Sequence, residues 1–227
     1  MAKRSDFIVV VTGDIVKSRL YSPRERERVQ KELLNSWKRV KRFFPEEFRS
    51  TLSFRVTAGD EFQYVCGSFT IALTSLTMLR LRMRALGFEP PVTIRAAIGV
   101  GTRTVGGSRN SYTQDGPAFR LAREGIERLD KNRLHPLTVV LGLQKDGQTL
   151  INDVLALSDR IYAKWTAAQA QVLLQAVALK PPGDIARALK MSNAAVSTHL
   201  RRAAWYEYIR VITSIAQDAP FSGPIRS

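Results

Sequence analysis

The sequence predicts an α+β protein in which a ferredoxin-like α/β sandwich precedes an all-α helix-turn-helix domain. Short β-branched segments alternate with amphipathic helices up to about residue 145, and no strand pattern follows. Two short helices separated by a tight turn then lie near the C-terminus. We expect residues 1–145 to form the sandwich, 146–218 the helical domain and 219–227 a loose tail.

The first strand is expected at Phe7 to Asp14, and Ser22-Pro23 begins the first helix with an N-cap and a first-turn proline. The other expected elements are a hairpin of Thr51–Thr57 and Phe62–Cys66, a helix from Ser68 to Ala85, a strand from Val92 to Val100, a helix from Pro117 to Lys131 and a strand from Leu137 to Leu141. This order is typical of ferredoxin-like sandwiches, where the helices lie on one face of the sheet.

Charge and composition narrow the class of partner. The chain has 35 Lys and Arg against 20 Asp and Glu, a net charge of +15, which suggests a polyanionic partner such as nucleic acid. The longest apolar-leaning stretch, Phe69 to Leu79, is too short to cross a bilayer, so no membrane contact is expected. The single cysteine, Cys66, fits a reducing compartment, and we expect a cytoplasmic protein.

The C-terminal pattern predicts a DNA-binding module. Asp184–Lys190 and Ala194–Trp205 form two helices around the turn Met191–Asn193, an arrangement that resembles LuxR-type regulators and sigma-factor region 4. The alternative is an ordinary three-helix bundle with a basic, solvated face. The residues expected to contact double-stranded DNA are Ser192, Asn193, Ala195, Ser197, Thr198, Arg201 and Arg202.

Two carboxylates stand at strand ends in the N-terminal part. Asp14 follows the first strand and Asp60 lies in the predicted hairpin turn, so both face the same end of the sheet if the strands are neighbours. Such a pair could bind one or two Mg²⁺ ions. Taken singly, either aspartate is more typical of a turn-capping carboxylate.

Four motifs resemble those of class III nucleotidyl cyclases: Asp14-Ile15-Val16, Gly59-Asp60, Ile94–Gly101 and Gly116–Arg123. Ala58–Phe62 also resembles the GGDEF signature of diguanylate cyclases, which share the palm-like fold. With the start Gly13–Arg19 and the helix-turn-helix, the set resembles the SatD family. The resemblance implies Mg²⁺ or Mn²⁺ ligands at Asp14, Asp60 and the Ile15 carbonyl. It implies nucleotide contacts from Ser18, Arg19, Gly59, Glu61, Gly116, Arg120 and Arg123.

The chain departs from the cyclase pattern at three positions. Val56 stands where adenylyl cyclases have a purine-selecting lysine, Arg120 where they have the ribose-orienting asparagine, and Glu124 where they have the transition-state arginine. Losing that cationic clamp removes transition-state stabilisation, so no catalytic residue is assigned.

These observations predict a homodimeric, DNA-binding transcriptional regulator whose degenerate cyclase-like domain binds a nucleotide or nucleotide-derived messenger, such as a cyclic nucleotide, with Mg²⁺. One alternative is an active cyclase or nucleotide-condensing enzyme with an attached DNA-binding module. Another is a nonspecific DNA- or RNA-binding protein, since basic residues also line the first helix.

Overall fold

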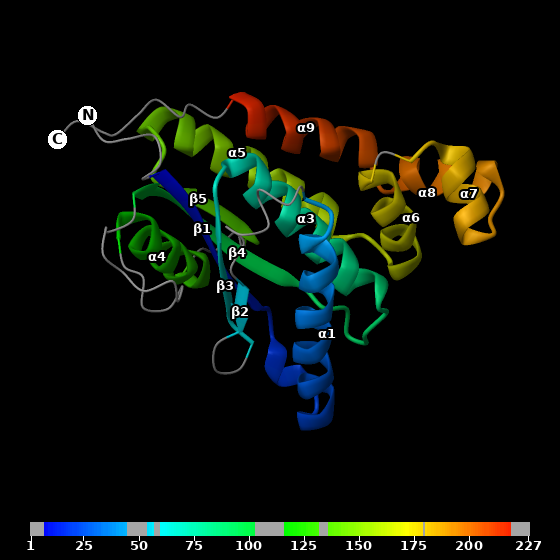
Figure 1. Ribbon diagram of the computed structural model, residues 1–227, viewed down its shortest axis with the longest axis horizontal. Helices are drawn as coiled ribbons and strands as arrows, with labels where there is room; N and C mark the ends of the chain where they lie inside the picture. Colours follow the sequence, from blue (N-terminus) through cyan, green and yellow to red (C-terminus); the bar gives the residue numbers. More distant parts are fainter. Residues whose placement is uncertain are drawn as a thin grey trace.

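The computed structural model describes residues 7–44, 54–56, 60–102, 116–131, 136–178 and 180–218. A five-stranded sheet in the order β2-β3-β1-β4-β5 forms its centre (Figure 1). The strands are β1 (Phe7–Ile15), β2 (Phe54–Val56), β3 (Phe62–Cys66), β4 (Ile94–Thr102) and β5 (Thr138–Leu141). Only the β4–β5 pair is parallel among the described strands, so the sheet is mixed. The predicted α+β class is confirmed.

The helices begin and end close to the predicted bounds where capping residues define them. Ser22 caps α1, and Ser68 caps α3 by accepting a hydrogen bond from the Ile71 amide. The helices are α1 (Pro23–Lys41), α3 (Phe69–Ala85), α4 (Pro117–Lys131), α5 (Lys145–Ala163), α6 (Ala167–Val177), α7 (Pro182–Leu189), α8 (Asn193–Arg202) and α9 (Trp205–Asp218), with a short 3₁₀ turn η2 (Ser18–Leu20).

Helices cover both faces of the sheet, which corrects the expectation that they lie on one. Val9 and Val11 of β1 pack with α1 and α3, whereas Ile8 and Val10 point to the opposite face and pack under α4. The close approach of α4 depends on Gly99 of β4, because a Cβ there would lie 2.1 Å from the Ala118 carbonyl oxygen. A strand buried on both faces reads as a continuous apolar run, so the pattern of β1 alone does not reveal a second layer.

The C-terminal helices share one hydrophobic cluster with the sheet. The Tyr208 and Thr77 hydroxyls lie 3.3 Å apart, and the Trp165 indole donates to the Ala203 carbonyl at 2.8 Å. Figure 1 shows α9 running alongside α5, while α7 and α8 lie at the far end of the molecule. The predicted boundary between Gly142 and Thr149 falls at the start of α5; whether the two parts fold independently stays a prediction.

Side chains of α5 bind the outer edge of β5. Asn152 accepts a hydrogen bond from the Val140 amide at 2.7 Å and donates to the Val140 carbonyl at 2.9 Å. Gln148 accepts from the amides of Gly142 and Leu143 at 2.8 and 3.2 Å. These amide side chains take the place of a further strand, so α5 is held against the edge of the sheet.

Candidate functional site

The chain leaves β1 through a constrained turn. The Val16 amide donates to the Thr93 carbonyl at 2.9 Å, and Lys17 then adopts the left-handed conformation with φ 56°. A non-glycine residue in that region carries a conformational cost and is typical of sites where the surrounding structure fixes the backbone. Ser22 and Glu25 form a capping box that fixes the start of α1 directly after the turn.

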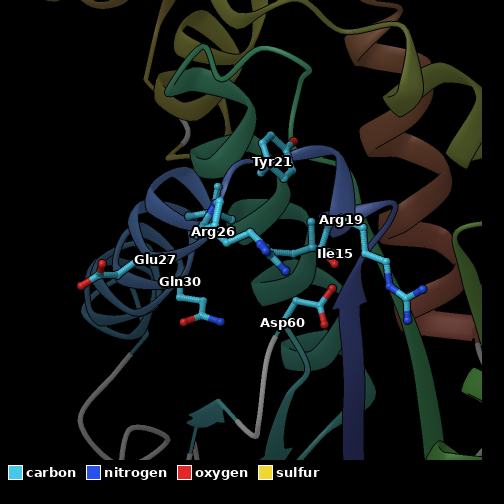
Figure 2. Close-up of a pocket in the computed structure, with 10 residues that line it drawn as sticks. Ile15, Arg19, Tyr21, Arg26, Glu27, Gln30 and Asp60 are labelled. Atoms are coloured by element: carbon cyan, nitrogen blue, oxygen red, sulfur yellow. The ribbon is translucent and has the colours of Figure 1, made fainter.

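A pocket of about 420 Å³ lies between this turn, the first turns of α1 and Asp60, two residues before β3. It is lined by Ile15, Ser18, Arg19, Tyr21, Pro23, Arg26, Glu27, Val29, Gln30 and Asp60. Figure 2 shows the Arg26 guanidinium and the Asp60 carboxylate directed toward the same region of the pocket, while Glu27 points away from it. One region of the pocket is therefore lined by a positively charged side chain, Arg26, and a negatively charged one, Asp60.

Tyr21 anchors the apolar side of the pocket. Its ring is buried, with 4% of the residue exposed, and its hydroxyl donates to the Pro90 carbonyl at 2.8 Å. Burial raises the pKa of Tyr21, so the phenol stays protonated near neutral pH. The Tyr21 side of the pocket is therefore uncharged, whereas the side chains of Arg19 and Arg26, which also line the pocket, are positively charged.

Asp14 is held by an arginine on the neighbouring strand. Arg95 of β4 donates through Nε and Nη2 to the two Asp14 oxygens at 2.7 and 2.6 Å, and its Nη1 lies 2.5 Å from the Asp130 carboxylate of α4. We call this trio of Asp14, Arg95 and Asp130 the Arg95 bridge. Hydrogen bonding to Asp14 raises the pKa of Arg95 further, so the guanidinium is permanently charged.

The carboxylates at the end of β1 are not arranged to hold a divalent cation. Both Asp14 oxygens already accept from Arg95, and Asp14 is not among the pocket-lining residues that include Asp60. Across the described ranges, no three His, Cys, Asp or Glu side chains gather closely enough to hold a metal ion. As arranged here, the residues expected to bind Mg²⁺ or Mn²⁺ do not fit a cation.

The structure brings part of the predicted nucleotide set together. Ile15, Ser18, Arg19 and Asp60 line the pocket, and Glu61 is exposed next to it in sequence. Gly59 lies outside the described residues. Gly116, Arg120 and Arg123 belong to the α4 layer and do not line the pocket.

Glu124, at the position of the cyclase clamp arginine, is an exposed carboxylate paired with Arg128 at 2.5 Å. This pair occupies the middle of α4, on the face of the sheet opposite α1. At the position where class III cyclases carry a positively charged arginine, α4 therefore carries a carboxylate, and that carboxylate is already paired with Arg128.

Sequence reasoning missed Arg26, Gln30 and Arg95 as site residues. Arg26 and Gln30 lie one helical turn apart at the start of a helix that is basic on most of its surface, so the pattern does not single them out. Arg95 had a usable signal, because it is the one charge in a strand otherwise made of small or apolar residues and hydroxyls. Its partner emerges only from the register, in which Asp14 faces Arg95.

The second candidate site is on α8. The turn between α7 and α8 places Lys190 in the left-handed region with φ 53°, and the Ser192 hydroxyl caps α8 by accepting from the Ala195 amide at 3.1 Å. Val196 and Leu200 are buried against the neighbouring helices. Of the residues predicted to contact DNA, Ser192, Asn193, Ser197, Arg201 and Arg202 are exposed, while Ala195 and Thr198 are half-buried.

Within the described ranges, no helix is both long and apolar enough to cross a membrane.

Solved structures with a similar fold are cyclase domains. The catalytic core of a rhodopsin-guanylyl cyclase in complex with ATPαS is 15% identical, with a TM-score of 0.42 over 53% of this chain and 71% of that one. The guanylate cyclase domain from Catenaria anguillulae in complex with GTP is 14% identical, with the same TM-score and the same coverage. A bacterial light-regulated adenylyl cyclase is 12% identical, with a TM-score of 0.44 over 60% and 75% of the two chains.

Curated protein sequences contain no match to this chain. The model of the SatD family, in contrast, matches residues 7–217, which is nearly the whole sequence and includes both the sheet and the C-terminal helices. The resemblance inferred from the motifs is thereby confirmed, and the chain belongs to the SatD family.

Proposed function

We propose that the protein binds a nucleotide or nucleotide-derived ligand in the pocket at the end of β1. The observation that carries the proposal is the composition of that pocket, which joins two guanidinium groups, Arg19 and Arg26, to the Ser18 hydroxyl and an apolar wall around Tyr21. Guanidinium groups bind phosphate oxygens strongly, and a volume of about 420 Å³ is within the range of small-ligand sites. The Gln30 amide and Asp60 supply hydrogen-bond partners for a sugar or base.

Calorimetric titration with ATP, GTP and their cyclic forms tests this proposal. Arg26→Met should weaken the binding of whichever nucleotide binds by tenfold or more, about 1.4 kcal/mol, because it removes a cation aimed into the pocket. Arg24→Met is the matched control, since Arg24 is exposed on the same helix and does not line the pocket. If no nucleotide binds to the wild type, or if both variants lose affinity equally, the proposal is wrong.

The enzymatic alternative is turnover of a nucleoside triphosphate to a cyclic or linear product. Binding without turnover is favoured because the clamp position carries Glu124, which is paired with Arg128. Incubation with each triphosphate and Mg²⁺ or Mn²⁺, followed by mass spectrometry, separates the two functions. Accumulation of a cyclic nucleotide or a dinucleotide would establish the enzyme instead.

A second candidate function is binding of double-stranded DNA through α8. The observation that favours it is the exposed row of Asn193, Ser197, Arg201 and Arg202 on a helix whose other side is buried through Val196 and Leu200. Short polar side chains and arginines on an exposed helix are suited to base edges and phosphates in the major groove. In this proposal the nucleotide bound near β1 modulates DNA binding by a homodimer.

Fluorescence anisotropy with DNA fragments at several salt concentrations tests the second candidate. Arg202→Ala should weaken binding and lower the slope of log affinity against log salt by about 1, as expected for one lost phosphate contact. Arg210→Ala on α9 is the control, because Arg210 is equally exposed but outside α8. Binding that disappears on addition of competitor DNA would indicate the nonspecific alternative, and a monomer by light scattering would contradict the dimer.

A further inference from the structure

We infer that this site binds its nucleotide without a divalent cation, because the Arg95 guanidinium occupies the place at Asp14 that a cation would take. The inference rests on the proposed nucleotide-binding function and concerns the source of positive charge at the site. It is drawn from the Arg95 bridge, from the pocket residues and from the pairing of β1 with β4.

The pairing of β1 with β4 builds the bridge into the sheet. Asp14 and Arg95 are direct cross-strand partners near the end of the antiparallel ladder, so their side chains leave the same face of the sheet next to each other. Asp14 is 8% exposed, and both of its oxygens accept from the planar Arg95 fork at 2.7 and 2.6 Å. A carboxylate in this bidentate arrangement has its charge neutralised and its strongest acceptor directions taken.

A divalent cation would therefore compete with an internal cation. To bind Asp14 it would have to break two charge-assisted hydrogen bonds, and among the described residues it would leave Arg95 with only the Asp130 carboxylate, which is 55% exposed. The bridge as a whole holds one guanidinium between two carboxylates, so its side chains already carry a net negative charge of one unit. Removing Arg95 would leave two neighbouring carboxylates without a counter-ion, which is the arrangement that divalent cations prefer.

The pocket itself supplies positive charge of its own. Arg26 comes from α1, on the face of the sheet opposite α4, and its guanidinium points into the pocket, which Arg19 of η2 also lines. Phosphate oxygens placed there meet permanently charged guanidinium groups, whose donors satisfy them directly. Neither Asp14 nor a metal bound to it is needed for that contact.

Electron paramagnetic resonance of Mn²⁺ tests the claim about Asp14 independently of any nucleotide. The wild type should leave the signal of free Mn²⁺ unchanged. Arg95→Met, which frees Asp14 and Asp130, should lower that signal, and Arg95→Met with Asp14→Asn should restore it. Arg128→Met is the matched control, because it breaks an arginine–glutamate pair elsewhere on α4 and should create no Mn²⁺ site. Binding of Mn²⁺ by the wild type that is lost in Asp14→Asn would overturn the inference.

Calorimetry with ATP and GTP, first in EDTA and then in excess Mg²⁺, tests the claim about the ligand. We expect affinities that agree within about twofold, less than 0.5 kcal/mol. Affinity weaker by tenfold or more in EDTA would overturn the inference while leaving the proposed nucleotide-binding function intact. Absence of binding under both conditions would overturn the proposed function as well. These wild-type measurements need no variant, so the test stays decisive even if Arg95→Met fails to fold.

Discussion

Two arginine–aspartate pairs of this protein differ in almost every respect: one joins the helices α3 and α5, and the other joins the strands β1 and β4. Arg80 and Asp159 meet in the interior between α3 and α5, where their side chains are 4% and 5% exposed. Arg95 and Asp14 meet near the end of β1, where their side chains are 22% and 12% exposed. The first pair is enclosed on all sides and the second is partly open to solvent.

The interior pair is saturated with hydrogen bonds. Arg80 donates to the carbonyls of Ile94 and Leu137 at 3.1 and 2.8 Å as well as to Asp159 at 3.1 Å. Asp159 in turn accepts from the Leu137 amide and the Thr138 hydroxyl, both at 2.8 Å. Because the partners lie in β4, in β5, at the residue directly before β5 or in a helix packed on these strands, this pair holds the layers of the fold together.

The pair at the strand end bonds almost entirely to carboxylates. Arg95 contacts Asp14 and Asp130, and neither contact is to the backbone. The contacts of Arg95 are therefore ion pairs with side chains, which other ions can replace. Arg80, in contrast, also donates hydrogen bonds to backbone carbonyls. The same two residue types therefore stabilise the fold where they are buried and saturated with hydrogen bonds, and remain partly accessible to solvent where they lie near a strand end.

The largest effect is expected for Asp159→Asn. The substitution keeps the volume of the side chain but leaves the buried Arg80 guanidinium without a counter-charge, which should cost about 3–5 kcal/mol of unfolding free energy. Denaturation by guanidinium chloride measures the loss. Asp153→Asn, at an exposed position on the same helix, should change the free energy by less than about 0.5 kcal/mol. Equal effects of the two substitutions would remove the distinction between the interior pair and an ordinary surface charge.

Thr138→Val tests the contribution of one hydrogen bond to Asp159 without removing either charge of the Arg80–Asp159 pair. It removes the hydroxyl that donates to Asp159 and leaves the Arg80 contact in place, so the expected cost is about 1.5 kcal/mol. Thermal unfolding followed by circular dichroism gives the comparison with Asp159→Asn. A cost as large as that of the charge removal would mean that the hydrogen-bond network, rather than the ion pair, holds the layers.

Arg84→Met should stabilise the protein by about 1 kcal/mol, because it removes a buried charge whose Nη2 makes only a long hydrogen bond, of 3.4 Å, to the Thr93 hydroxyl. Arg84 lies one turn from Arg80 and its guanidinium sits 5.2 Å from the Tyr162 ring, yet its buried Nε has no hydrogen-bond partner among the described residues. Arg80→Met, at the paired position, should destabilise the protein in the same denaturation assay. A loss of stability in Arg84→Met would show that stacking on Tyr162 outweighs the cost of burying the charge.

The smallest effect is expected for Asp130→Asn at the strand end. Asp130 is the more exposed partner of Arg95, and an exposed ion pair contributes about 0.5 kcal/mol or less. That contribution should disappear in molar salt, whereas the cost of Asp159→Asn should not. If Asp130→Asn lowered the unfolding free energy by more than about 2 kcal/mol regardless of salt, the Arg95 bridge would contribute to stability in the same way as the interior pair, and the distinction between the two pairs would be wrong.

Much of the fold was predictable because local patterns define it. The β-branched segment at β1, the capping serine at α1 and the tight turn before α8 each carry a signal within a few residues. The position of α4 was not predictable, since it depends on Gly99 and Gly125 making room for close helix packing. Their local sequence places Gly99 in a strand and Gly125 in a helix, but it does not indicate that these two elements pack closely against each other.

The candidate site was predictable only at its sequence-adjacent residues. Ile15, Ser18 and Arg19 follow β1 directly, and Asp60 stands just before β3. The Arg95 bridge joins residues 81 positions apart, and its geometry follows from strand register, which hydrophobic patterning does not reveal. The expected metal pair of Asp14 and Asp60 follows from the strand ends and from the cyclase resemblance, and neither indicates the guanidinium that the neighbouring strand brings to Asp14.

The amide side chains that bind the outer edge of β5 also bear on assembly. Asn152 occupies both the N–H and the C=O of Val140, so a strand from a second molecule could add there only by displacing α5. The opposite edge of the sheet is the short strand β2. A dimer that continues the sheet from one subunit into the next would therefore have to form through β2, and the β5 side is protected against runaway edge-to-edge aggregation.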